Sequence, residues 1–105
     1  MSWLYLLLAG LFEMGWPIGF KLSQNDNFKF QGIALAIIFM ALSGFFLWLA
    51  QKTIPIGTAY AVWTGIGAVG TLAVGIVFFG DSSNFWRLFS AMLIVLGIIG
   101  LKLTD

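Results

Sequence analysis

Four long apolar segments constrain the fold of this 105-residue chain more than any other feature of its sequence. A helix needs about 20 residues to cross a hydrocarbon core of about 30 Å. The segments cover approximately residues 3–22, 30–51, 58–79 and 85–101. Each is continuously apolar, whereas the strands of a membrane β-barrel would alternate between apolar and polar residues. We therefore predict an all-α membrane protein with four transmembrane helices in one domain, residues 1–105.

The composition excludes several classes of function. Only 9% of the residues are charged and 61% are hydrophobic, whereas a soluble domain has about 25% charged residues. A net charge of +1 without a run of Lys or Arg argues against a nucleic-acid partner. The absence of Cys and His excludes disulfides, thiolate catalysis, Cys/His metal sites and a Ser-His-Asp triad. We expect neither an enzyme nor a bound metal or cofactor.

The loop charges leave the orientation in the membrane almost undetermined. Short polar connections make consecutive helices antiparallel neighbours, so the N-terminus, the second connection and the C-terminus share one side. That side carries Lys52 and Lys102, and the other side carries Lys21, Lys29 and Arg87. Orientation follows Lys/Arg asymmetry in short loops. Three against two predicts insertion in both orientations, which suits an antiparallel dimer.

Glu13 is the residue most indicative of function. It lies about 10 residues, or about 15 Å, from either end of the first span. An ionised carboxylate there costs several kcal/mol unless it is paired or hydrated, and the later spans carry no charge at comparable depth. Glu13 must therefore hold a proton, receive a mobile cation, or do both in turn. The structural alternative is a protonated glutamate that is hydrogen-bonded to a neighbouring helix.

Three residues near Glu13 in the sequence are candidates to act with it. Gly10 and Trp16 lie three residues before and after it, so all three share one helix face. An aromatic ring beside a carboxylate suits an organic cation, and Gly10 permits close approach of a helix or substrate. Pro17 lacks the N–H that would bond the Glu13 carbonyl. We expect a kink there, with gating or cation coordination as a hypothesis and packing as the alternative.

The second and third spans supply further candidates. Tyr60 and Trp63 are one turn apart and share a face. A tyrosine hydroxyl can hydrogen-bond a carboxylate and order it. Ser43 is one of the few hydroxyl-bearing residues of the second span and could do the same. Packing alone is the alternative for each.

Small residues predict the helix contacts. Gly65, Gly67 and Gly70 spell G-x-G-x-x-G, but no strand precedes them, so a dinucleotide site is excluded. We interpret Gly65 and Gly67 as points of bending or close packing. In the fourth span, Ser90 and Gly97 are seven residues apart on one face and predict a dimer contact.

A dimer would bring two Glu13 carboxylates to one chamber, which four helices of this length cannot readily enclose alone. Such a pair titrates as a unit and holds protons or a cation, but not comfortably both. This competition is the minimal physics of proton-coupled antiport.

Three stretches give the chain a family resemblance. They are Gly10-x-x-Glu13-x-x-Trp16 followed by Lys21, residues 55–67 (PIGTAYAVWTGIG), and residues 96–102 (LGIIGLK). With these motifs the whole chain resembles the small multidrug resistance family. The resemblance implies an antiparallel, dual-topology homodimer of the bacterial inner membrane that exchanges protons for small organic cations by alternating access.

The resemblance also implies roles for individual residues. Glu13 matches the shared proton and substrate site, Tyr60 and Trp63 match its aromatic lining, and Ser43 matches its hydroxyl. Trp16, together with residues 63–65, is similar to the guanidinium exporter subtype. Guanidinium presents a planar fork of donors that fits a carboxylate.

Some alternatives remain open. The chain departs from that subtype at Met14, Gly15 and Pro17, so a multidrug exporter of quaternary ammonium compounds is the second candidate. A small ion channel and a structural or regulatory subunit are further classes. The expected partners are the cation, protons, the lipid bilayer and a second copy of the chain, with a paralogue as the alternative to that copy.

Overall fold

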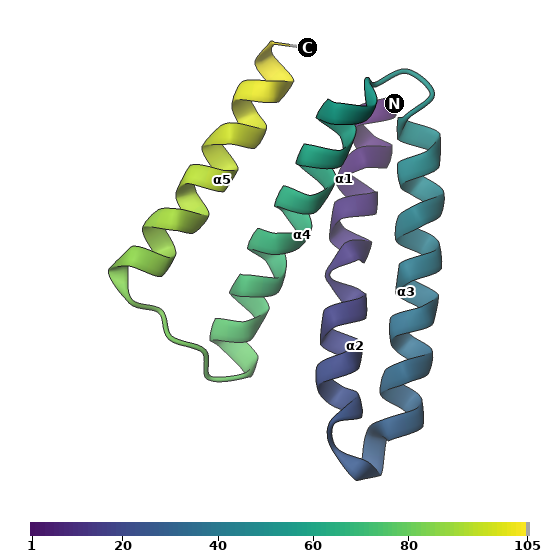
Figure 1. The fold of residues 1–105 in the computed structure, drawn as a ribbon, viewed down its shortest axis with the longest axis vertical. Coiled ribbons are helices and arrows are strands. Elements are labelled where there is room, and N and C mark those ends of the chain that lie inside the picture. Colours follow the sequence, from purple (N-terminus) through teal and green to yellow (C-terminus); the bar gives the residue numbers. More distant parts are fainter. Residues whose placement is uncertain (105) are drawn as a thin grey trace.

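The computed structural model describes residues 1–104, and every secondary-structure element within them is a helix (Figure 1). The elements are α1 (Ser2–Glu13), α2 (Gly15–Ser23), the short 3-10 helix η1 (Asp26–Phe28), α3 (Lys29–Ala50), α4 (Ile56–Phe78) and α5 (Phe85–Leu103). Four segments of this described part are long and apolar enough to cross a membrane, namely Ser2–Ser23, Asp26–Ala50, Ile56–Phe78 and Phe85–Leu103. The predicted all-α fold with four such helices is confirmed.

The helices run alternately in opposite directions and form a slab. The α3–α4 connection lies at the same end as the N-terminus and the end of α5, and the other two connections lie at the opposite end (Figure 1). The principal extents are 45 × 34 × 17 Å. The longest is close to the thickness of a bilayer with its headgroups, about 40–45 Å.

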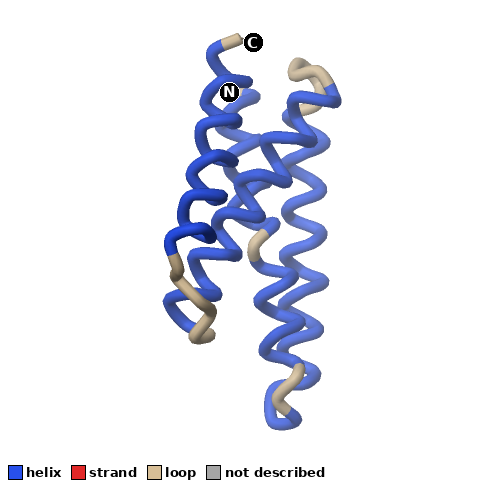
Figure 2. Tube along the Cα trace, turned by 60° about the vertical axis from the view of Figure 1, so that its left-hand side comes forward, coloured by secondary structure: helices blue, strands red, loops and turns tan. Residues whose placement is uncertain are grey.

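The first span is interrupted in its middle. α1 ends at Glu13 and α2 begins at Gly15, with a turn at Met14 that Figure 2 shows as a short loop within the span. Pro17 has no N–H to donate to the Glu13 carbonyl, and the next bond, from Ile18 N to Met14 O, is stretched to 3.4 Å. The first span is therefore interrupted next to Pro17, where a kink is predicted, and the interruption places the carboxylate at the end of α1.

Glycines let α2 and α3 lie close together. A Cβ built on Gly19 would be 2.7 Å from the Gly32 carbonyl oxygen, and one built on Gly32 would be 2.8 Å from the Cα of Ser23. These obstacles are backbone atoms, which cannot move aside as a flexible side chain can. The α2–α3 pair is thus a closely packed unit next to the break.

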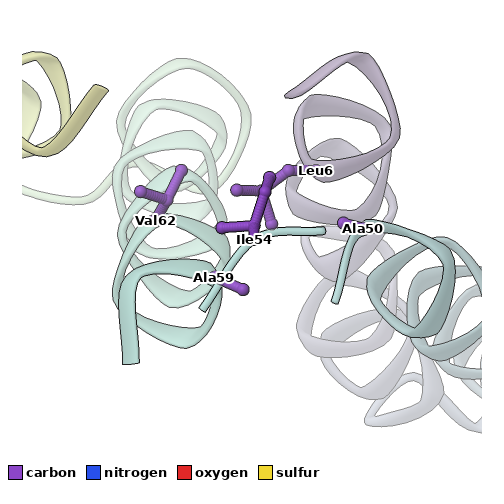
Figure 3. Close-up of a cluster of buried hydrophobic side chains, with 5 residues drawn as sticks. All are labelled: Leu6, Ala50, Ile54, Ala59 and Val62. Carbon is purple, nitrogen blue, oxygen red and sulfur yellow. The ribbon is translucent and has the colours of Figure 1, made fainter. Parts of the chain in front are cut away.

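The buried apolar cluster lies where α1, α4 and the α3–α4 connection meet (Figure 3). It consists of Leu6, Ala50, Ile54, Ala59 and Val62. α5 differs, because it packs against α4 and has no buried residue. Most of its apolar side chains therefore face the surroundings of the single chain, whereas Ile98 and Leu101 pack against the buried cluster.

Candidate functional site

The carboxylate of Glu13 is held from one side. Trp16 Nε1 donates a hydrogen bond of 2.7 Å to Glu13 Oε1, across the break in the first span. Ser43 Oγ lies 3.5 Å from the same oxygen. Among residues 1–104, the side-chain hydrogen bonds to this carboxylate end on Oε1.

Ser43 connects three helices behind Glu13. Its side chain is 1% exposed, its Oγ donates to the Ala9 carbonyl at 2.8 Å, and Trp63 Nε1 donates to its Oγ at 2.7 Å. A hydroxyl has one hydrogen to donate, and 3.5 Å is long for a hydrogen bond. The Ala9 carbonyl therefore takes that hydrogen in this conformation. Ser43 joins α1, α3 and α4, and its hydroxyl oxygen lies beside the Glu13 carboxylate without donating to it in this conformation.

Two glycines bring α4 against α1 at the level of Glu13. A Cβ on Gly67 would lie 2.6 Å from Glu13 Cγ, and a Cβ on Gly10 would lie 2.6 Å from Ile66 Cβ. Both residues thus lie where the two helices approach closely. Gly65 faces a different neighbour, since a Cβ there would lie 2.9 Å from Ile98 Cδ1 on α5.

An open cleft of about 470 Å³ begins at Glu13. It lies between the first span, α4 and the α4–α5 loop. Its lining residues are Glu13, Trp16, Pro17, Thr64, Gly67, Ala68, Thr71, Leu72 and Asp81. This lining includes two carboxylates and no Lys or Arg. A cation entering the cleft would therefore meet negative charge and hydroxyl oxygens rather than a fixed positive side chain.

Some predicted residues lie away from the cleft in the single chain. Tyr60 is 57% exposed, and its ring centroid is 5.4 Å from that of Trp63, but neither residue is part of the cleft lining. Within residues 1–104, hydrogen bonding links Trp63 to the neighbourhood of Glu13 through Ser43. Ser90 and Gly97 are exposed on α5, and a Cβ on Gly97 would meet open space.

Three polar residues of the cleft lining were not predicted from the sequence. Thr64 and Thr71 lie seven residues apart and share a face of α4, so their periodicity could have identified them. Asp81 lies in the loop after α4 and reaches the cleft by the folding of that loop. No local sequence pattern indicates that position.

The comparison with protein families shows which family the chain belongs to. The sequence profile described as Small Multidrug Resistance protein matches residues 1–94. The chain belongs to the small multidrug resistance family. The predicted resemblance is confirmed, and it makes the chain a multi-pass membrane protein of a transporter family rather than an enzyme.

Proteins named Guanidinium exporter are similar to this chain over nearly its full length. The protein from Yersinia pseudotuberculosis serotype I (strain IP32953) is 50% identical over 105 residues, which is 100% of both chains. The protein from Proteus vulgaris has the same identity and coverage. The protein from Escherichia coli (strain K12) is 49% identical over 104 residues, 99% of this chain and 98% of its own.

Proposed function

We propose that this chain is a proton-coupled antiporter that exports guanidinium-like cations across the bacterial inner membrane. One observation carries the proposal. The Glu13 carboxylate lies in the middle of a span and opens onto a cleft whose lining has no Lys or Arg. Full-length similarity of 49–50% to proteins named Guanidinium exporter supports the substrate class.

The geometry at Glu13 suits a planar cation. Trp16 fixes one carboxylate oxygen at 2.7 Å, so the orientation of the carboxylate is set before a cation arrives. Guanidinium can then bind with its donor fork across the carboxylate. Trp16 also lines the cleft, where its indole ring can contribute cation–π attraction.

Coupling follows from competition at one carboxylate. At this depth an ionised carboxylate without a partner is costly. A bound proton and a bound cation each neutralise the carboxylate. The binding of one therefore lowers the affinity of Glu13 for the other. A carrier that changes its open side only when Glu13 is neutralised will therefore exchange protons for cations.

The working assembly is an antiparallel homodimer of dual topology. The cleft is open on one side in the single chain, and α5 has no buried residue. Ser90 and Gly97 provide a small-residue face for contact with a second α5. The near balance of Lys and Arg between the two sides favours both orientations. A non-identical paralogue is the alternative partner.

Current recording on solid-supported membranes tests the function. Purified protein in liposomes receives pulses of guanidinium, alkylguanidines or tetramethylammonium, with and without a pH gradient. We expect guanidinium currents that reverse or shrink as the proton gradient is changed. Currents that ignore the proton gradient would instead identify a channel. Because exchange of one proton for one guanidinium moves no net charge, the substrate class is rejected only if guanidinium causes neither a current nor a pH change inside the liposomes.

A quaternary ammonium exporter is the second candidate, because the cleft volume of about 470 Å³ falls in the range of sites for drug-sized ligands. Quaternary ammonium ions lack N–H donors, so they gain nothing from a carboxylate oriented for hydrogen bonding. Competition in the same liposomes decides between the two. Each ion is tested as a competitor of the other. The second candidate is favoured if tetraalkylammonium inhibits guanidinium transport at a lower concentration than guanidinium needs to inhibit tetraalkylammonium transport.

A further inference from the structure

The loop after α4 folds back onto its own helix. Gly80 has a positive φ of 73°, a conformation that glycine adopts readily, and it turns the chain at the end of α4. The Asp81 N–H then donates to the Gly75 carbonyl at 3.0 Å. The Asp81 carboxylate lies against Gly75, where any side chain would collide with it. The position of Asp81 is therefore set by the structure of the loop.

Asp81 lines two adjoining clefts. The first is the cleft of Glu13, and the second, of about 200 Å³, extends towards Lys21. The two clefts share Pro17, Thr71 and Asp81 in their linings. Because they share these residues, the two clefts adjoin, and we refer to them together as the path between the α4–α5 loop and the mid-span carboxylate.

One face of α4 forms a wall of this path. Thr64, Ala68, Thr71 and Gly75 follow at spacings of four, three and four residues, so they share a face. Each lines one of the two clefts, and Thr71 lines both. Small side chains leave room for a cation, and two hydroxyl groups offer it oxygen atoms.

We propose that Asp81 is a second cation-binding residue, at the mouth of the path, which captures the incoming organic cation before Glu13 binds it. This inference rests on the proposed function and deepens it. Asp81 is exposed, so an ion pair between its carboxylate and a cation is weak. A cation captured there can therefore dissociate readily and move on to Glu13. A cleft lined by one sign of charge also raises the local concentration of the opposite ion. Lys21 in the second cleft opposes this effect.

The test compares Asp81→Asn with Asp26→Asn in liposomes. Asp26 begins η1 at the same end of the bundle, so both substitutions remove one negative charge from the same side, but Asp26 lines neither cleft. At low ionic strength, Asp81→Asn should raise the KM for guanidinium about threefold to tenfold with little change in maximal rate, because local attraction raises the encounter rate. Salt at about 0.15 M should shrink the difference. Lys21→Gln should lower the KM.

Each result decides between alternatives. An Asp81→Asn KM within twofold of the unsubstituted protein overturns the inference, as does an equal change in Asp26→Asn, which would indicate a general surface-charge effect. Asp81→Glu keeps the carboxylate and should keep most of the affinity, and size-exclusion chromatography verifies the fold of each variant. Failure of the unsubstituted protein to carry guanidinium would reject the proposed substrate instead. The comparison is then made with whichever cation of the panel it carries.

Discussion

The helices around Glu13 and the last helix use small residues in opposite ways. The space beside Gly10 and Gly67, where a Cβ would lie, is occupied by other atoms of the same chain. These atoms belong to Ile66 at Gly10 and to Glu13 at Gly67. On α5, Gly97 and Gly100 face open space. The first arrangement shows close packing already completed within one chain, and the second shows a surface that the chain itself leaves uncovered.

The hydrogen bonds follow the same division. Ser43 joins α1, α3 and α4 through bonds to Ala9 and from Trp63. The hydroxyl bonds of α5 stay within that helix, as in the bond from Ser90 Oγ to the Trp86 carbonyl. The hydrogen bonds around Glu13 and Ser43 therefore lie within the α1–α4 region. The contribution of α5 must come from what it contacts outside the chain, and a second copy is the partner that we propose.

The largest expected effect comes from removing the charge inside the α1–α4 region. Glu13→Gln keeps the shape of the side chain but cannot ionise, so proton-driven guanidinium exchange should be abolished. Loss of a buried, hydrogen-bonded charge pair costs about 2–5 kcal/mol, which corresponds to at least about 30-fold in affinity. Binding is measured by calorimetry and exchange by liposome currents.

Glu13→Asp is the matched control for this prediction. It keeps a carboxylate one carbon further from the cleft and should retain exchange at a reduced rate. Both variants should elute as the unsubstituted protein does, because neither changes α5. Proton-driven guanidinium transport by Glu13→Gln would contradict the mechanism.

The sequence predicts those features of the helices and of the Glu13 region that arise within one span. The length of the apolar runs predicts the helices, the missing N–H of Pro17 predicts a weak point in the helix near Glu13, and the spacing of three residues predicts that Trp16 shares a face with Glu13. Each depends on helix geometry alone. Packing between spans adds no condition to any of them.

Features that arise between spans could not be predicted in the same way. Trp63 was expected beside the carboxylate, but in the single chain it binds Ser43, whose hydroxyl is in turn bonded to Ala9. The rotation and depth of one helix against another decide such contacts, and one sequence leaves both undetermined. Asp81 illustrates the same limit, because a loop places it rather than a helix period.

A smaller effect is expected from filling the open face of α5. Gly97→Leu adds a side chain where the single chain has free space, so the fold of the chain should persist. Overpacking of a well-packed contact costs about 1–3 kcal/mol, which would weaken the proposed dimer by about 5-fold to 150-fold. Dimer dissociation is measured by energy transfer between labelled chains in lipid.

Gly44→Leu is the control for this prediction. Gly44 lies on α3, is exposed, and also has no atom within 4 Å of a Cβ built on it. If Gly97 belongs to a specific contact, only its variant should shift the dimer to single chains. If both variants dissociate equally, or if neither dissociates, α5 is not part of the dimer contact and its exposed face contacts lipid.

The smallest effect is expected from Ser43→Ala. This substitution removes hydrogen bonds inside the α1–α4 region but keeps the Glu13 carboxylate, so it tests the two contributions separately. The substitution leaves Trp63 Nε1 without its acceptor and removes the side-chain hydrogen bond to the Ala9 carbonyl, at a cost of about 1–3 kcal/mol in stability. Thermal unfolding in detergent should detect this loss. Ser23→Ala, which removes an exposed bond to the Phe20 carbonyl, should leave the unfolding temperature nearly unchanged.

The effect of Ser43→Ala on transport should be modest because Trp16 remains the closer donor to Glu13. Loss of one ordinary hydrogen bond corresponds to about threefold to tenfold in the KM for guanidinium, and proton coupling should survive. A loss of transport as complete as that of Glu13→Gln would mean that Ser43 controls the carboxylate directly. The 3.5 Å contact would then shorten in a conformation other than this one, and the long distance seen here would mark one state of the transport cycle.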